Sequence, residues 1–406
     1  MNDRAPSITP ADATAAPSGL HMTYLIEGIL SFAANLLFIG IFFYTKTIFH
    51  WTLVQNFLLA AAQGAVYVMA SLASQGLARR LSDRGLLIFS NSALAAVSLV
   101  GVLVSSQAIL TVVIIAYVPL MALNWPVLEA ATSAGADPHT LSRRIGMYNL
   151  IWAGTGALAV AVQGTLLKFD ARMVFLVPFV IHVGIAVMIV AVKRYARRSQ
   201  DKASQATQPA HLDAEPALLQ KRTLALWLSR ITLPSTYVVI YSLSALMPML
   251  PVMQRLDTTA QTVVGSVWMI SRWGMFWFLG ATLFWHTRPA LLLVAAVLMG
   301  VAFVGVTAPV GLVWMILAQV LLGAVLGLIY TASLYFGMVL SEGSTEHAGY
   351  HEALIGLGQV LGPGAGALTQ WKWKGSLRAG VMAVSLLVVV SLCAAAVAAI
   401  KARRRV

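Results

Sequence analysis

Residues 193–222 read KRYARRSQDKASQATQPAHLDAEPALLQKR and form the longest polar segment of the chain outside its N-terminal tail. Alanine, serine, glutamine and charged residues in this mixture are typical of a flexible linker. Long apolar segments lie on both sides of this linker. The linker therefore divides the chain into two parts of similar length, and each part needs its own interpretation.

The apolar segments predict an all-α membrane protein. Of the 406 residues, 59% are hydrophobic and only 10% are charged, whereas a soluble globular protein has about 25% charged residues. A helix needs about 20 mostly apolar residues to cross a bilayer. That criterion predicts twelve transmembrane helices, six before the linker and six after it: residues 23–45, 53–75, 85–106, 108–131, 145–167, 173–193, 223–250, 260–284, 289–307, 311–337, 347–370 and 379–400.

The positive charges predict how these helices are oriented. The formal net charge of +13 could indicate a nucleic-acid partner, but the lysines and arginines fall in short clusters between apolar segments. With both termini in the cytoplasm, 18 of the 27 lie on the cytoplasmic side and 7 in outer loops, and Arg230 and Arg272 lie within spans. This asymmetry is typical of a multi-pass protein of the inner (plasma) membrane. We therefore predict a lipid bilayer as surroundings and no nucleic-acid partner.

The predicted organisation has five parts. They are a cytoplasmic tail (1–21) without the apolar core of a signal peptide, a six-helix bundle (22–193), a central cytoplasmic loop (194–222), a second six-helix bundle (223–400) and a basic tail (401–406). A weak repeat relates the bundles. Gly146-Met-Tyr-Asn149 opens the fifth helix and Gly349-Tyr-His-Glu352 opens the eleventh, so Asn149 and Glu352 occupy matching positions. Two six-helix halves with parallel repeats are one established plan for secondary transporters.

The loop after the second span carries a recognisable motif. It reads SQGLARRLSDRGLLIF (residues 74–89), and Leu81-Ser82-Asp83-Arg84 resembles the core of the loop motif of the major facilitator superfamily. The motif is eroded, because Arg79 stands in place of its opening glycine and Leu87-Ile88 in place of its closing basic pair. The resemblance implies two six-helix bundles related by a pseudo-two-fold axis. It also implies that Asp83 and Arg84, with neighbouring Arg80, help to lock the halves on the cytoplasmic side.

Three carboxylates, Glu27, Glu129 and Glu352, fall within predicted spans. An ionisable group in hydrocarbon is costly, so each is a candidate for function. For Glu129 the plainer interpretation is a salt bridge to a loop arginine, and the alternative is a direct role in transport. For Glu27 we consider proton binding and a structural hydrogen bond. The loop arginines are Arg79, Arg80, Arg84, Arg143 and Arg144.

His351 and Glu352 are adjacent at the start of the eleventh span. Adjacent side chains point about 100° apart on a helix, so the two cannot face one partner. One is expected to face the cavity or the opposite half, and the other a neighbour such as the tenth span. We consider three roles for them: an interdomain gate contact, proton or substrate coupling, and helix capping. Further along, Gly358, Gly362 and Pro363 predict a hinge.

Arg272 is the deepest charge, about twelve residues from either end of the eighth span. Backbone carbonyls, tyrosine hydroxyls or an anionic substrate could be its partner, and arginine suits carboxylate or phosphate. The predicted substrate site consists of Arg272, Asn35, Asn124, Tyr241 and Tyr330. Trp125, Trp152, Tyr330 and Tyr335 could form an aromatic wall or could be packing residues.

No phosphate-binding loop, metal-binding motif or nucleophile elbow is found, so we predict neither an enzyme nor a bound cofactor or metal. The favoured function is a monomeric secondary active transporter. It would move a small organic solute, anionic or amphipathic, by alternating access and with proton coupling. Glu27, Glu129, Asn149, His351 and Glu352 would serve the proton step or the cytoplasmic gate. The alternatives are an uncoupled facilitator and a non-transporting sensor or assembly protein on the same scaffold.

Overall fold

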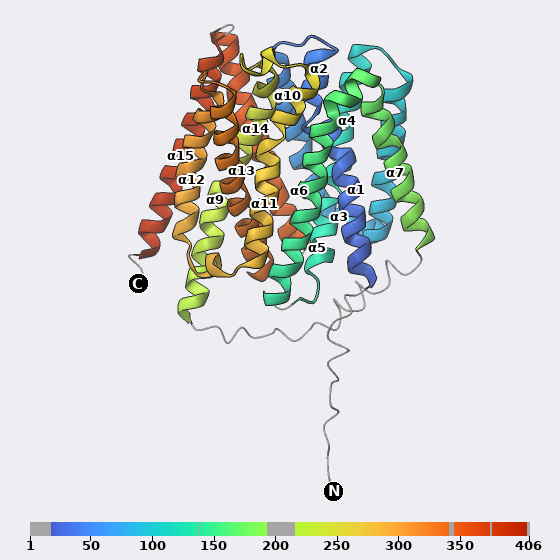
Figure 1. The fold of residues 1–406 in the computed structure, drawn as a ribbon. Coiled ribbons are helices and arrows are strands. Elements are labelled where there is room, and N and C mark those ends of the chain that lie inside the picture. Colours follow the sequence, from blue (N-terminus) through green and yellow to red (C-terminus); the bar gives the residue numbers. More distant parts are fainter. Residues whose placement is uncertain (1–17, 137, 193–215, 341–344, 374–375, 404–406) are drawn as a thin grey trace.

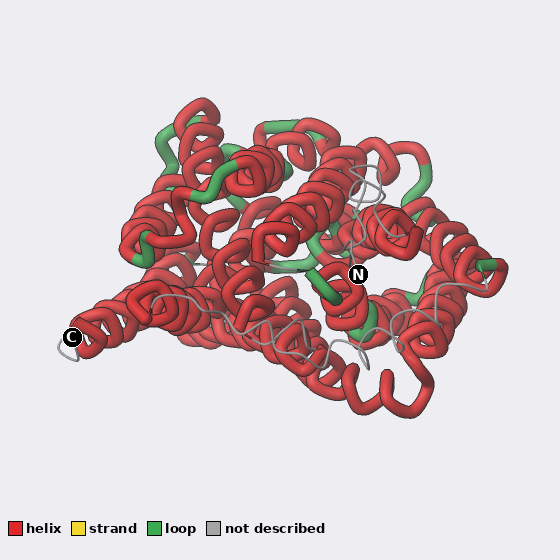
Figure 2. Tube along the Cα trace, turned by 90° about the horizontal axis from the view of Figure 1, so that it is seen from below, coloured by secondary structure: helices red, strands yellow, loops and turns green. Residues whose placement is uncertain are grey.

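The computed structural model describes residues 18–136, 138–192, 216–340, 345–373 and 376–403, and these residues form helices and no strand (Figures 1 and 2). Much of the predicted tails and of the central loop lies outside the described residues. We call residues 18–192 the first half and residues 216–403 the second half. The all-helical membrane fold is confirmed.

The first half contains seven helices, which cover six predicted spans. Two of these spans belong to one 51-residue helix, α3, which at about 1.5 Å per residue would be more than twice as long as a bilayer is thick. The helix breaks at Ser82, whose backbone has a φ of 64°. The hydroxyl of Ser82 accepts a hydrogen bond from the Gly85 amide at 3.2 Å, which caps the continuing helix. The helices are α1 (Ser18–Phe38), α2 (Ile41–Thr47), α3 (Leu53–Leu103), α4 (Gln107–Ala122), α5 (Trp125–Ser133), α6 (Pro138–Phe169) and α7 (Met173–Ala191).

The second half has the same plan. Its helices are α9 (Pro216–Leu246), α10 (Thr258–Gly265), α11 (Val267–Ala281), α12 (Ala290–Thr307), α13 (Leu312–Leu340), α14 (Thr345–Lys372) and α15 (Leu377–Arg403), with short 3₁₀ turns η2 (Met247–Met249), η3 (Met253–Arg255) and η4 (Phe284–Thr287). Among the described residues, nine helical stretches are long and apolar enough to cross a membrane, and α3 is one of them. Each of the twelve predicted spans coincides with one of these helices, with part of α3 or with a consecutive pair of helices.

Both described ends of the chain lie at the same end of the bundle, at the bottom of Figure 1. We call this the lower end, and the end that carries α2 and α10 the upper end. The two halves meet along two pairs of helices, α14 on α3 and α6 on α11. In each pair the fifth span of one half packs on the second span of the other, so the two pairs are equivalent.

The halves touch at both ends. At the upper end Lys168 forms an ion pair with Asp257 at 2.7 Å, and the Gly164 amide donates to the Thr262 hydroxyl at 3.1 Å. At the lower end α6 and α11 approach so closely that a Cβ atom added to Gly146 would lie 3.0 Å from the Gly280 Cα. The space between the halves is therefore closed on both sides.

Candidate functional site

A cavity of about 70 Å³ lies between the two halves. It receives eight side chains from each half, and nine of the sixteen are aromatic. Arg272 and Glu352 are its two ionisable groups besides tyrosines. The lining residues are Ser31, Asn35, Phe38, Ile39, Tyr67, Trp125, Tyr148, Trp152, Tyr237, Ile240, Tyr241, Trp268, Arg272, Tyr330, Glu352 and Ile355.

Arg272 lies against two indole rings. Its guanidinium carbon is 4.6 Å from the ring centroid of Trp152, on α6 of the first half, and 4.8 Å from that of Trp268, on α11. The side chain is only 4% exposed. The sequence allows backbone carbonyls and tyrosine hydroxyls as protein partners of Arg272. In the structure Arg272 interacts with a tyrosine hydroxyl, that of Tyr237. Among the described residues, the one ion pair with its atoms within 4.0 Å joins Lys168 and Asp257. No carboxylate of that part of the chain therefore lies within this distance of the Arg272 guanidinium group.

Four of the five residues predicted for the substrate site line this cavity: Arg272, Asn35, Tyr241 and Tyr330. Asn124 does not. Its side-chain oxygen accepts hydrogen bonds from Ser90 at 2.8 Å and Asn91 at 2.9 Å, within the first half. Since these bonds hold it away from the cavity, we correct its placement in the substrate site.

The aromatic wall is larger than the sequence indicated. Trp125, Trp152 and Tyr330 contribute to it as predicted, whereas Tyr335 stacks on His286 near the lower end with ring centroids 4.3 Å apart. Sequence reasoning missed the remaining aromatic residues, namely Phe38, Tyr67, Tyr148, Tyr237 and Trp268. Their position in spans was visible in the sequence, but the face of the helix that turns inward was not.

Glu129 and Glu352 meet across the interface between the halves. Glu352, on α14, accepts a hydrogen bond from the Tyr67 hydroxyl on α3. Glu129, on α5, accepts one from the Tyr330 hydroxyl at 3.4 Å and interacts directly with Glu352. Both side chains are at most 3% exposed.

The predicted salt bridge of Glu129 to a loop arginine is wrong. Arg144 donates to the Ala134 carbonyl at 3.0 Å, and Arg84 donates to the carbonyls of Ile189 and Val190 on α7. These carbonyls end helices of the same half and satisfy the guanidinium groups there. Glu129 is left facing a second carboxyl group.

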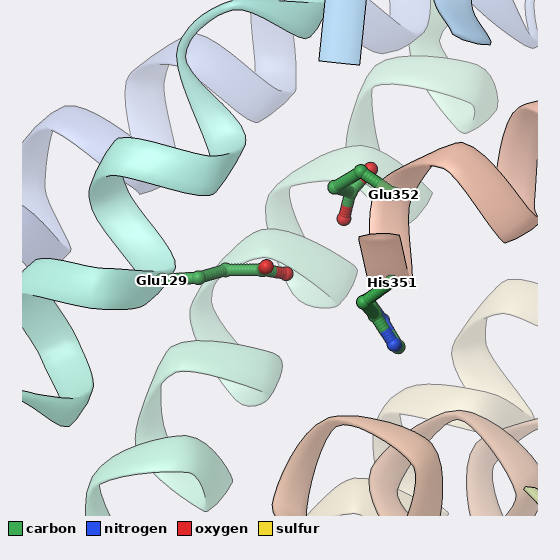
Figure 3. A group of neighbouring side chains, drawn as sticks. All are labelled: Glu129, His351 and Glu352. Atoms are coloured by element: carbon green, nitrogen blue, oxygen red, sulfur yellow. The ribbon is translucent and has the colours of Figure 1, made fainter. Parts of the chain in front are cut away.

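His351 completes a cluster with these two residues. Figure 3 shows Glu129 reaching from α5 toward α14, with Glu352 on one side of its carboxyl group and His351 on the other. One ligand atom from each of the three lies within 4.8 Å of the other two. A hydrogen bond of 3.1 Å also joins the Nδ1 atom of His351 and the hydroxyl of Ser333, on α13. Carboxylate and imidazole groups at this spacing could hold a small cation, either a proton or a metal ion.

Glu27 and Asn149 lie behind the cavity wall. Glu27 accepts hydrogen bonds from Ser31 at 2.8 Å and from the Trp125 indole at 3.1 Å. Asn149 accepts one from the Trp152 indole at 3.1 Å. Both residues therefore orient side chains that line the cavity, and neither is itself part of the lining.

The residues of the loop motif do not join the two halves in the structure. Arg84 bonds to α7 of its own half, as described above, and Arg80 and Asp83 are exposed. The interdomain lock that the resemblance implied for these residues is therefore not formed by Arg84. The contact between the halves at this end is made by α6 with α11 and by the Glu129 cluster.

The glycines predicted as a hinge are sites of close packing. A Cβ atom on Gly358 would lie 2.1 Å from the Pro234 carbonyl oxygen, and one on Gly362 would lie 2.5 Å from that of Val238. Both contacts are made to α9 of the same half. Pro363 lies inside α14, which runs unbroken from Thr345 to Lys372. Bending at this point stays a prediction.

These features define a membrane transporter: a bundle of apolar helices in two similar halves, with a central cavity closed at both ends. The chain belongs to the Major Facilitator Superfamily, whose sequence profile matches residues 23–363. It is accordingly a multi-pass membrane protein that binds small molecules, and it is not an enzyme.

Solved structures agree on the fold. The human organic anion transporter MFSD10 (TETRAN) has a TM-score of 0.68 at 12% identity, over 94% of this chain and 100% of that one. The nucleoside transporter NupG has a TM-score of 0.61 at 13% identity, over 96% and 99%. No curated protein sequence matches the chain significantly.

Proposed function

We propose that this protein is a monomeric, proton-coupled secondary active transporter of a small organic anion with an aromatic or otherwise apolar body. The single observation that carries the proposal is Arg272, a buried cation at the cavity wall with no carboxylate partner among the described residues. A guanidinium group held this way is costly unless another charge offsets it. A carboxylate or phosphate of the solute would offset it through paired hydrogen bonds.

The rest of the wall supports the same class of solute. Trp152 and Trp268 both lie against the guanidinium group and help to hold it in place. The other aromatic side chains offer faces for the apolar body of the solute. The description of one similar structure, an organic anion transporter, agrees with this class, although a likeness at 12% identity speaks for the fold alone.

The size of the cavity supports alternating access. Pockets for organic ligands have volumes of about 300–1,000 Å³, and this cavity holds about 70 Å³. The two halves must therefore separate before a solute enters. In this proposal the structure is a contracted, closed state that is too small for the solute and from which the halves open to either side.

Glu129 and Glu352 support proton coupling. Neither carboxyl group can donate a hydrogen bond to the other unless one of them holds a proton. Two ionised carboxylates facing each other out of water would repel. A proton on the pair therefore favours the closed lower end, and its loss favours opening, so solute movement and proton movement become linked. The excess of lysine and arginine supports a cytoplasmic location for the lower end and for both termini, in the inner (plasma) membrane.

A binding experiment tests the solute class. Purified protein is heated with a panel of aromatic carboxylates, sulfonates and phosphates, each beside its neutral amide or ester. A solute that binds only the native state at about 100 times its Kd stabilises that state by about 2.7 kcal/mol. We expect anions to raise the melting temperature of the wild type and of Arg255→Met, an exposed control, but not that of Arg272→Met. An equal response of all three proteins would refute the assignment of Arg272.

Uptake into proteoliposomes separates the alternatives. We expect an inward proton gradient to drive accumulation of the solute identified in the panel. Flux that is saturable but unaffected by the pH gradient would favour the uncoupled facilitator. Binding without any flux would favour the non-transporting sensor.

A further inference from the structure

A second cavity, of about 10 Å³, lies inside the second half between α9, α13 and α14. That volume is about the space that one water molecule needs. Arg230, Ser333, Gly337 and His351 are among its lining residues, and it shares no lining residue with the central cavity. The two spaces are therefore separate in the closed structure.

His351 and Glu352 face these two spaces from one turn of α14. Glu352 lines the central cavity, and His351 lines the second one. The angle of about 100° between adjacent helical side chains makes this possible. The adjacent imidazole and carboxylate thus line the two cavities from neighbouring positions of one helix.

The surroundings of His351 leave its ring able to exchange a proton. Nδ1 contacts the Ser333 hydroxyl at 3.1 Å, while Nε2 is buried and has no hydrogen-bond partner among the described residues. A ring nitrogen lies within 4.8 Å of a carboxylate oxygen of both Glu129 and Glu352. Imidazole can accept a proton at one nitrogen and release one from the other.

The charged and titratable groups around the ring come from each helix packed against it. Arg230 approaches from α9 on the side of the second cavity. The Tyr330 ring, on α13, stands edge-on to the imidazole at 5.1 Å. Glu129, on α5, and Glu352, held by Tyr67 of α3, lie on the side of the interface.

We propose that His351 relays protons between the second cavity and the Glu129–Glu352 pair, so that the coupling proton and the solute use separate routes. This inference rests on the proposed proton coupling. In the step, a hydronium ion in the second cavity gives its proton to the imidazole and becomes water. The imidazolium then gives a proton to the carboxylate, and a carboxylic acid and a neutral imidazole remain. His351 thereby sets the rate of protonation, and the two glutamates set its equilibrium.

The test is a pH jump on the purified full-length protein in nanodiscs, with the proton as the only ligand. The intrinsic tryptophan fluorescence follows closure of the lower end in a stopped-flow instrument. We expect His351→Gln to slow the response at least tenfold while its amplitude and midpoint pH stay those of the wild type. Imidazole added to the buffer should restore the rate. Glu129→Gln and Glu352→Gln should lose the amplitude.

A matched control is His182→Gln, which alters a second buried histidine. His182 bonds to the Tyr117 hydroxyl at 2.7 Å and to Asn91 at 3.0 Å, inside the first half. We expect it to leave the rate unchanged.

Each contrary outcome has a separate meaning. A wild type without any pH response would refute the proton coupling itself. A wild-type response with an unchanged rate in His351→Gln, or with a lost amplitude in that variant, would overturn the relay while the coupling stands. If Mn²⁺ or Zn²⁺ stabilises the wild type and each of the three variants abolishes the effect, the cluster is a metal site and the relay is overturned.

Discussion

Arg272 illustrates, at the scale of one residue, what the proposed binding site costs in stability. Its charge is buried against two tryptophans and has no carboxylate partner within the described parts of the chain. An apolar side chain of similar length would avoid the cost of burying that charge. Function at such a position is commonly kept at the expense of stability.

We therefore predict opposite effects of Arg272→Met on stability and on binding. Without ligand, the variant should melt at the same temperature as the wild type or a few degrees higher, because it removes an uncompensated buried charge. Binding of anions should be lost. Differential scanning fluorimetry with and without the anion measures both. A variant that melts well below the wild type would mean that Arg272 holds the fold together.

Glu129 shows what the sequence cannot provide at this scale. Its depth in the membrane and its unusual charge could be predicted from its place in an apolar span. Its partner could not, because the sequence gives a position along a helix but neither the direction of the side chain nor the helix opposite. The nearest cations in the sequence were in the loops, yet Glu352, more than two hundred residues later, is the group that it meets.

At the scale of the element, α14 is packed closely on both sides. It lies against α9 of its own half through Gly358 and Gly362, and against α3 of the other half through Gly356. One face therefore holds the second half together, and the other forms part of the surface that separates in the proposed transport cycle.

A pair of substitutions tests the face of α14 that packs on α9. Gly358→Ala should lower the melting temperature by several degrees, because its Cβ atom would lie 2.1 Å from a carbonyl oxygen of α9. Gly364→Ala, in the same helix with no atom within 4 Å, should leave it unchanged or raise it. Thermal melts in one detergent measure both. Equal stability of the two variants would indicate that α14 can move away from α9, as a hinge requires.

The spans were predictable because a bilayer demands about 20 consecutive apolar residues, and that pattern is local. The interruptions within them were harder to see. The eighth predicted span is divided at Ser266 into α10 and α11, and the first between α1 and α2. Near these divisions the halves touch, where Gly265 lies close to Phe43, and such contacts leave no periodic signal in the sequence.

At the scale of the whole molecule, the two ends are closed by different chemistry. The upper end uses an ion pair exposed to water, and the lower end uses buried carboxyl groups and closely packed glycines. The ends should therefore respond to different conditions.

Asp257→Asn tests the upper end. The Lys168 ammonium group, and then the amides of Ala260 and Thr259, lower the pKa of Asp257 below its ordinary 3.8. Its contribution to stability is therefore complete above about pH 4 and is lost as the pH falls through the lowered pKa. Asparagine still caps α10, so only the charge is removed. The difference in melting temperature from the wild type should be constant from pH 5 to 8, shrink near pH 3 and decrease with salt.

Lys168→Gln should reproduce that profile. If the difference in melting temperature instead changed between pH 5 and 8, it would not originate in this ion pair. Such a change would indicate that the upper end is coupled to Glu129 and Glu352 at the lower end.

A bulky substitution between the halves tests the lower end. Gly280→Leu places a side chain where α6 and α11 touch, so the lower end should stay open. Hydrogen–deuterium exchange should rise in peptides covering residues 140–152 and 348–356. Gly274→Leu, on the same helix with no atom within 4 Å, should exchange like the wild type. Equal protection in the two variants would place the closing contact elsewhere.

The small volume of the closed cavity also separates two kinds of compound that a chemist would otherwise group together. In the proposed cycle, an anion that fits when both ends close can complete the cycle and is carried across. A longer anion with the same head group can reach Arg272 from an open side but keeps the ends apart, so it remains bound and acts as an inhibitor. As the tail of the compound lengthens, its potency as an inhibitor should therefore persist while its rate of transport falls. The tail length at which transport is lost measures the largest solute that the protein can carry.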